Sequence, residues 1–132
     1  MSLAAGLQHS VESLADELAE AISNRDAAGA SRHVREDGHV VYVSDGTVIR
    51  GTEYRAALAR FYATLGQLKF EWERYEVRAI GSRVAVLTGW AKIHAVDHAG
   101  TATDTRAIFT LLFGQDGFGG WELVTAHKTT LP

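Results

Sequence analysis

The chain has 132 residues, a formal net charge of −3 and no cysteine. Apolar residues make up 46% and charged residues 22%, which is typical of a globular domain and not of a disordered segment. The lack of cysteine excludes disulfides, thiolate catalysis and cysteine-bound zinc. No run of lysine or arginine occurs, so a nucleic-acid partner is not expected. We expect a single domain over residues 1–132.

The sequence shows no sign of a membrane or secretory segment. No apolar run is long enough to span a bilayer. Residues 1–8 also lack the basic and apolar regions of a secretory leader. We therefore expect a cytoplasmic protein with no membrane partner.

Two helices are predicted in the first third of the chain. Apolar residues recur at helical spacing from Leu7 to Asn24, opposite a face of carboxylates. Asp26 is a suitable N-cap for a short second helix that ends at about Val34.

A hairpin is predicted next. Residues 39–44 are rich in β-branched and aromatic side chains, and Asp45-Gly46 follows them. An Asp-Gly pair between such runs is typical of a tight turn, so residues 47–50 are expected to pair back.

A third helix is predicted after the hairpin, capped by Gly51-Thr52 and closed by Gly66. Its buried stripe is expected to contain six residues at helical spacing: Tyr54, Ala57, Leu58, Phe61, Tyr62 and Leu65.

Everything beyond Gln67 is predicted to be β-structure. Apolar residues alternate up to Trp72 and resume at Tyr75 in the opposite phase, which predicts a β-bulge near Glu73-Arg74 that bends the sheet. Turns are expected at 81–82, 98–100 and 116–120, which leaves strands at 83–96, 101–113 and 121–130. The fold class is therefore α+β, with three helices packed on a strongly curved antiparallel sheet and a cavity between the layers.

Several segments in this order carry a family resemblance: 18–28 (LAEAISNRDAA), 42–46 (YVSDG), Gly51, 81–89 (GSRVAVLTG), Asp116-Gly117, 121–124 (WELV) and His127. Together they resemble the nuclear transport factor 2-like superfamily, specifically its SnoaL-like branch. The resemblance implies a cystatin-like, cone-shaped fold that is usually dimeric through its sheet. The superfamily includes isomerases, dehydratases, epoxide hydrolases, cyclases and non-enzymatic binding domains, so the resemblance leaves the activity open.

The phase of each strand decides which side chains face the cavity. Within residues 83–96 one face is uniformly small or apolar and is assigned to the interior: Ala85, Leu87, Gly89, Ala91, Ile93 and Ala95. The opposite face carries Thr88, Trp90 and His94, and we expect it to form a homodimer interface. The alternative is that Trp90 merely lies on an exposed sheet face.

In the following strand Asp104, Arg106 and Thr110 share a face, and we place this face inside the cavity. Arg106 would then hold a ligand carboxylate through two parallel hydrogen bonds. The alternative is a surface ion pair between Asp104 and Arg106.

His127 is a candidate general acid/base, although a single histidine is more often structural. Lys128 points to the opposite face, so only one of the two can face the cavity. Trp72 and Tyr54 are candidates to stack on a flat ligand, and Tyr42 or Tyr54 to donate a hydrogen bond. Alternatively, these aromatic residues simply belong to the core.

The six histidines show no spacing typical of a metal site, and no cofactor fingerprint is present. Three functions remain open. The leading prediction is a homodimer that binds a small, mainly apolar ligand. The second is an isomerase or hydrolase, similar to ketosteroid isomerases or epoxide hydrolases, that uses His127 or the Asp104–Arg106 pair as general acid/base. The third is a dimerisation module whose cavity is filled by its own side chains.

Overall fold

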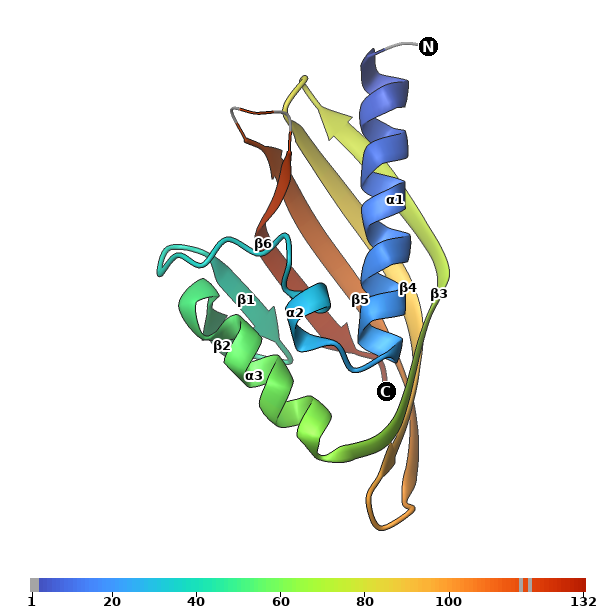
Figure 1. Ribbon diagram of the computed structural model, residues 1–132. Coiled ribbons are helices and arrows are strands. Elements are labelled where there is room, and N and C mark those ends of the chain that lie inside the picture. Colours follow the sequence, from blue (N-terminus) through green and yellow to red (C-terminus); the bar gives the residue numbers. More distant parts are fainter. Residues whose placement is uncertain (1–2, 117, 119) are drawn as a thin grey trace.

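The computed structural model describes residues 3–116, 118 and 120–132. Its elements are, in chain order, α1 (Leu3–Ser23), α2 (Ala27–Ala30), β1 (Val41–Ser44), β2 (Thr47–Arg50), α3 (Gly51–Ala63), β3 (Leu65–Ile80), β4 (Val84–Asp97), β5 (Ala102–Gln115) and β6 (Trp121–Thr130). The strands form one curved sheet in the order β2-β1-β6-β5-β4-β3, and the helices lie against one of its faces (Figure 1). The predicted α+β class is confirmed. Gly117 and Gly119 of the last predicted turn lie outside the described residues.

The sheet is antiparallel except for one pair, because β1 runs parallel to β6. The hairpin between β1 and β2 turns at Asp45 and Gly46, both of which have positive φ, as the Asp-Gly pair predicts. The parallel register places Ser44 beside Lys128. The first hairpin thereby extends the wall of the sheet next to the chain's last strand.

Several helix boundaries differ from the predicted ones. Helix α1 begins at Leu3, before the predicted Leu7. Helix α2 ends at Ala30, before the predicted Val34, and Val34 instead forms an isolated bridge with Leu123. Helix α3 begins at Gly51 itself, where a Cβ would overlap the Arg35 carbonyl oxygen, so only glycine fits this close approach. The helix ends at Ala63 and β3 begins at once, so the residue predicted as its cap, Gly66, belongs to the strand.

The predicted bulge in β3 is confirmed. Trp72 pairs with Ala91 and Arg74 pairs with Trp90, which leaves Glu73 as the extra residue. The extra residue turns both Trp72 and Tyr75 toward α1. The Trp72 indole Nε1 donates a hydrogen bond to the Ala15 carbonyl oxygen at 2.9 Å, and the two apolar faces are thereby held together.

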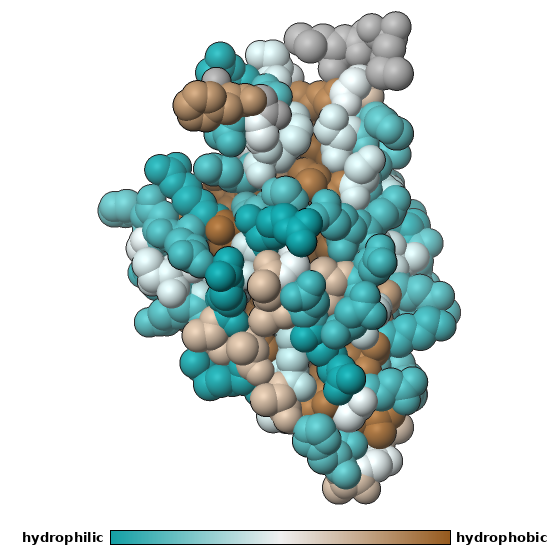
Figure 2. Space-filling model, in the orientation of Figure 1, coloured by the Kyte–Doolittle hydropathy of each residue, from teal (hydrophilic) through white to brown (hydrophobic). Residues whose placement is uncertain are grey.

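The core lies between α1 and the concave face of β4 and β5. The predicted interior phase of β4 is confirmed, because Ala85, Leu87 and Ala91 are all 0% exposed. Each buried aliphatic side chain of leucine size contributes about 1.5–3 kcal/mol to folding. Figure 2 shows that hydrophilic side chains cover most of the helix side of the molecule, with hydrophobic residues visible in recesses between them.

Among the described residues, no helix combines the length and apolar character that crossing a bilayer requires.

Gly89 is expected to be intolerant of any side chain. Its neighbour is the Trp72 ring, and a Cβ at Gly89 would overlap that ring. Gly89→Ala should lower the free energy of unfolding by about 1–3 kcal/mol, because the indole must shift within a close-packed core. Gly114→Ala in β5 is the matched control, since its Cβ would make an ordinary contact at 3.6 Å with Val124. Urea denaturation checks both variants, and equal stabilities would contradict this packing.

Candidate functional site

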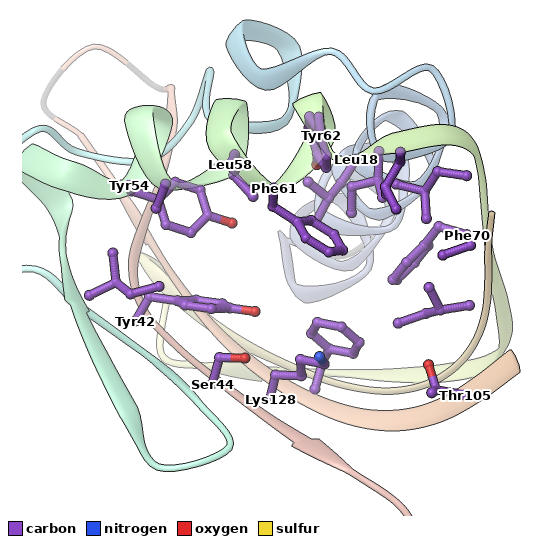
Figure 3. A pocket seen from close by; sticks show the side chains of 18 of the residues that line it. Leu18, Tyr42, Ser44, Tyr54, Leu58, Phe61, Tyr62, Phe70, Thr105 and Lys128 are labelled. Atoms are coloured by element: carbon purple, nitrogen blue, oxygen red, sulfur yellow. The ribbon is translucent and has the colours of Figure 1, made fainter. Parts of the chain in front are cut away.

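A cavity of about 490 Å³ lies between the concave face of the sheet and helices α1 and α3. Its wall is mainly apolar and aromatic, and the close-up in Figure 3 shows side chains from the sheet and both helices pointing into it. The aliphatic part of the lining includes Leu18, Ile22, Leu58, Leu65, Leu68, Ile93, Leu111 and Leu123. The chain's own side chains therefore do not fill the cavity.

Two aromatic groups form opposite parts of the wall. Phe70, Trp72 and Phe109 pack edge to face, with ring centroids 4.9–5.6 Å apart. Tyr42 from β1 and Tyr54 from α3 form a second edge-to-face pair at 5.2 Å. Such clusters offer flat apolar surfaces to a ring-shaped ligand.

The position of Phe61 in α3 differs from the predicted one. It lines the cavity but remains 50% exposed, so it lies at the entrance and not within the buried stripe.

Hydroxyl groups from both layers point toward the cavity, those of Tyr42, Tyr54, Tyr62, Ser44 and Thr105 among them (Figure 3). Burial raises the pKa of Tyr42 to about 12 and holds the pKa values of Tyr54 and Tyr62 above their usual range. The three phenols are therefore neutral near pH 7. Each can donate a hydrogen bond to a ligand.

Lys128 supplies the cavity's positive charge. Within the described part of the chain it is the one charged residue in the lining, and its side chain is 24% exposed. Its Nζ lies 3.6 Å from Asp45 Oδ2, a distance too long for a strong hydrogen bond. Lys128 is therefore a weakly neutralised ammonium at the edge of an apolar cavity.

Asp45 makes its shortest hydrogen bonds with Thr130 and not with Lys128. Its two carboxylate oxygens accept hydrogen bonds from the Thr130 backbone N–H at 2.6 Å and the Thr130 hydroxyl at 2.7 Å. These hydrogen bonds hold the pKa of Asp45 below its usual value of 3.8, the backbone N–H having the largest effect. Asp45 thus fastens the β1–β2 turn to the end of β6.

Three of the predicted ligand-contacting residues lie in the cavity wall. Tyr42, Tyr54 and Trp72 all belong to the lining. Of the pair His127 and Lys128, Lys128 is the one that faces the cavity, while His127 is exposed and paired with Thr110 on the other face.

The predicted cavity positions of Arg106 and Thr110 are wrong. In the β4–β5 register Arg106 pairs with Lys92 and Thr110 with Thr88, so both lie on the convex face. The inner face of β5 consists of the alternate residues Thr103, Thr105, Ala107, Phe109, Leu111 and Phe113, which the same register pairs with the inner residues of β4. The Arg106 guanidinium instead donates two hydrogen bonds to the Glu73 carboxylate, at 2.7 and 2.9 Å.

Asp104 also lies outside the cavity, and it does not pair with Arg106. Its carboxylate is 2.7 Å from His94 Nδ1, and its side chain is 80% exposed. The residues expected to supply general acid/base chemistry, namely Asp104, Arg106 and His127, are therefore all on the convex face. The same face carries Thr88, Trp90 and His94, as predicted, and the Arg74 guanidinium covers the Trp90 ring at 3.8 Å.

Several cavity residues were not among the predicted site residues, including Ser44, Tyr62, Thr105 and Phe109. Ser44 and Thr105 are small polar residues without a sequence signature, and Tyr62 was assigned to the core. Phe109 follows directly from the corrected phase of β5.

The sequence pattern of the SnoaL-like domain family matches residues 11–130. Among solved structures, the chain is similar to a nuclear transport factor 2-like superfamily protein from Salmonella enterica, with a TM-score of 0.83 at 13% identity, covering 97% of this chain and 93% of that one. It is also similar to a putative dehydratase of the nuclear transport factor 2-like family from Streptomyces avermitilis, with a TM-score of 0.78 at 19% identity, covering 92% and 94%.

A hexachlorocyclohexane dehydrochlorinase from Novosphingobium barchaimii is similar as well, with a TM-score of 0.81 at 9% identity, covering 96% of this chain and 88% of that one. At these identities the likeness extends to the fold alone. Curated protein sequences contain no significant match.

The Asp45 contact predicts a pH-dependent difference in stability. A carboxylate whose pKa is lowered on folding stabilises the folded protein above its unfolded pKa, and this contribution disappears as pH falls through the folded pKa. Asp45→Asn keeps the left-handed turn conformation but removes the charge. The wild type should therefore melt at a higher temperature than Asp45→Asn near pH 7, and the difference should shrink as the pH falls below the ordinary carboxyl value of 3.8, because the pKa of Asp45 is lowered in the folded protein. Thermal melts across this range check it; a difference that grows toward low pH would contradict the assignment.

Proposed function

The chain belongs to the SnoaL-like domain family, and we propose that it binds a small, mainly apolar molecule in the cavity between its sheet and helices. The observation that carries this proposal is the cavity itself. Its volume of about 490 Å³ falls in the range of small-molecule sites, and its lining combines many apolar side chains with a few convergent polar groups. Burial of ligand surface against this wall would supply the binding free energy.

Binding is favoured over general acid/base catalysis by the position of the ionisable groups. Within the described residues, the cavity lining contains no carboxylate and no imidazole. The tyrosines that do line it have raised pKa values and are poor bases near neutral pH. Asp104 and His127 lie on the far side of the sheet from any ligand in the cavity.

Cavity binding can be tested with N-phenyl-1-naphthylamine, a neutral dye that fluoresces in apolar surroundings. The wild type should bind the dye saturably. Ala57→Phe should weaken binding about tenfold or more, which corresponds to about 1.4 kcal/mol, because residue 57 lines the cavity and the new ring occupies its space.

Ala56→Phe is the matched control, since residue 56 is exposed on the same helix and makes no part of the lining. It should bind the dye as the wild type does. Equal binding by both variants, or no saturable binding by the wild type, would contradict the proposed site.

We also propose that the convex face of the sheet binds a second copy of this chain. No helix covers this face in Figure 1. Apolar residues lie side by side across its middle, since Trp90 pairs with Ile108 and Val86 with Leu112. The Arg106–Glu73 ion pair adds both signs of charge to the same face, and the His94–Asp104 hydrogen bond adds further polar groups. A face with a partly exposed apolar centre and both charges suits a two-fold interface, in which each patch meets its own copy.

Trp90→Glu should convert the dimer to a monomer in light scattering, because a carboxylate would be buried at the centre of the interface. Val48→Glu is the control, since Val48 is 54% exposed on the edge strand β2, which β1, β6 and β5 separate from β4. A wild-type monomer, or a Trp90→Glu dimer of unchanged affinity, would refute the interface.

A further inference from the structure

We propose that the ligand is an organic acid: a flat, largely apolar molecule whose single carboxylate is held by Lys128 Nζ with the hydroxyls of Tyr42 and Ser44. This inference rests on the proposed cavity binding and adds the chemical class of the ligand. It follows from the charge of the cavity lining, from the contacts of Lys128 and from the arrangement of β1 beside β6.

The described cavity lining carries one positive charge and no negative charge. Lys128 has three N–H donors and no acceptor, and no carboxylate belongs to this lining. The neighbouring hydroxyls can donate as well as accept hydrogen bonds. A ligand carboxylate would match this set, because it brings a negative charge and two oxygens with about four lone-pair sites.

The one ion pair of Lys128 among the described residues leaves N–H donors of the ammonium available to a ligand. Asp45, its only ion-pair partner among the described residues, is 3.6 Å away and already accepts two shorter hydrogen bonds from Thr130. An ammonium against an apolar wall is costly unless it is paired and hydrogen-bonded. A ligand carboxylate on the cavity side of Lys128 would complete its shell without disturbing the Asp45–Thr130 contact.

The parallel pairing of β1 and β6 brings the three anchor groups together. Ser44 is the register partner of Lys128, and Tyr42 lies two residues before Ser44 on the same face of the strand. Figure 3 shows the polar ends of Tyr42, Ser44 and Lys128 directed into the same part of the cavity. The Phe70, Trp72 and Phe109 cluster also lines the cavity and offers ring edges and faces to the apolar body.

The charge of the site argues for this ligand over two others. A cationic ligand would be repelled by Lys128 at close range. A phosphate ester carries close to two negative charges and is usually held by several cationic groups or backbone N–H groups. The described lining offers a single ammonium and no arginine. A ligand with a single negative charge therefore matches the single ammonium of the described lining.

The test uses two probes of the same shape, 2-naphthoate and its neutral analogue 2-naphthalenemethanol, competing with N-phenyl-1-naphthylamine at pH 7. The wild type should bind the acid about tenfold or more tightly than the alcohol, as expected for a charge-assisted hydrogen bond. Lys128→Met retains the length and apolar stem of the side chain. It should abolish this preference while leaving the alcohol's affinity within about twofold.

Lys92→Met is the matched control, because Lys92 lies on β4 with its side chain on the convex face. It should keep the wild-type preference for the acid. A wild type that binds both probes equally, or a Lys128→Met variant that keeps the preference, overturns the acid ligand and leaves cavity binding intact. Failure of both probes and of the dye in the wild type overturns cavity binding as well.

Discussion

The packing of the Trp72 indole determines how helix α1 lies against the sheet. The bulge at Glu73 turns Trp72 onto the concave face of β3, where its ring covers Gly89 and its Nε1 reaches the Ala15 carbonyl oxygen. Glycine at position 89 lets the ring lie against the β4 backbone, and the hydrogen bond holds α1 at that distance from the sheet. Trp72 also lines the cavity. The hydrogen bond and packing that hold α1 against the sheet therefore also fix the position of this part of the cavity wall.

The sheet separates two chemical environments. Its convex face carries the Arg106–Glu73 ion pair and the His94–Asp104 hydrogen bond, which are exposed and contribute little to stability. Its concave face carries apolar rings, neutral hydroxyls and Lys128. A ligand in the cavity would therefore meet hydroxyl groups and one positive charge, while Asp104, Arg106 and His127 lie behind the sheet. This separation supports the proposed binding function.

Much of the fold could be predicted from the order of apolar and polar residues. In β4 every second residue is small or apolar, which identifies the interior face. In β3 the alternation changes phase after Trp72, which requires a bulge. The residues of β5 that face the cavity could also have been predicted from the sequence. The three-residue turn 98–100 makes Asp97 and Thr101 partners, so odd-numbered residues on both strands share a face. The prediction that Arg106 faces the cavity is inconsistent with this register. The position of Lys128 could not be derived in this way, because the β5–β6 register shifts at Leu112/Phe113 and β1 joins β6 from a distant part of the chain.

The position of a bound ring in solution distinguishes the cavity from the convex face. Intermolecular nuclear Overhauser effects can be recorded between 2-naphthoate and isotope-labelled protein whose aromatic protons are assigned. Binding in the cavity predicts contacts from the naphthalene protons to Trp72 and Phe109, and from the ring edge nearest the carboxylate to Tyr42. Contacts to Trp90 and Ile108 on the convex face, with none to the cavity rings, would contradict it.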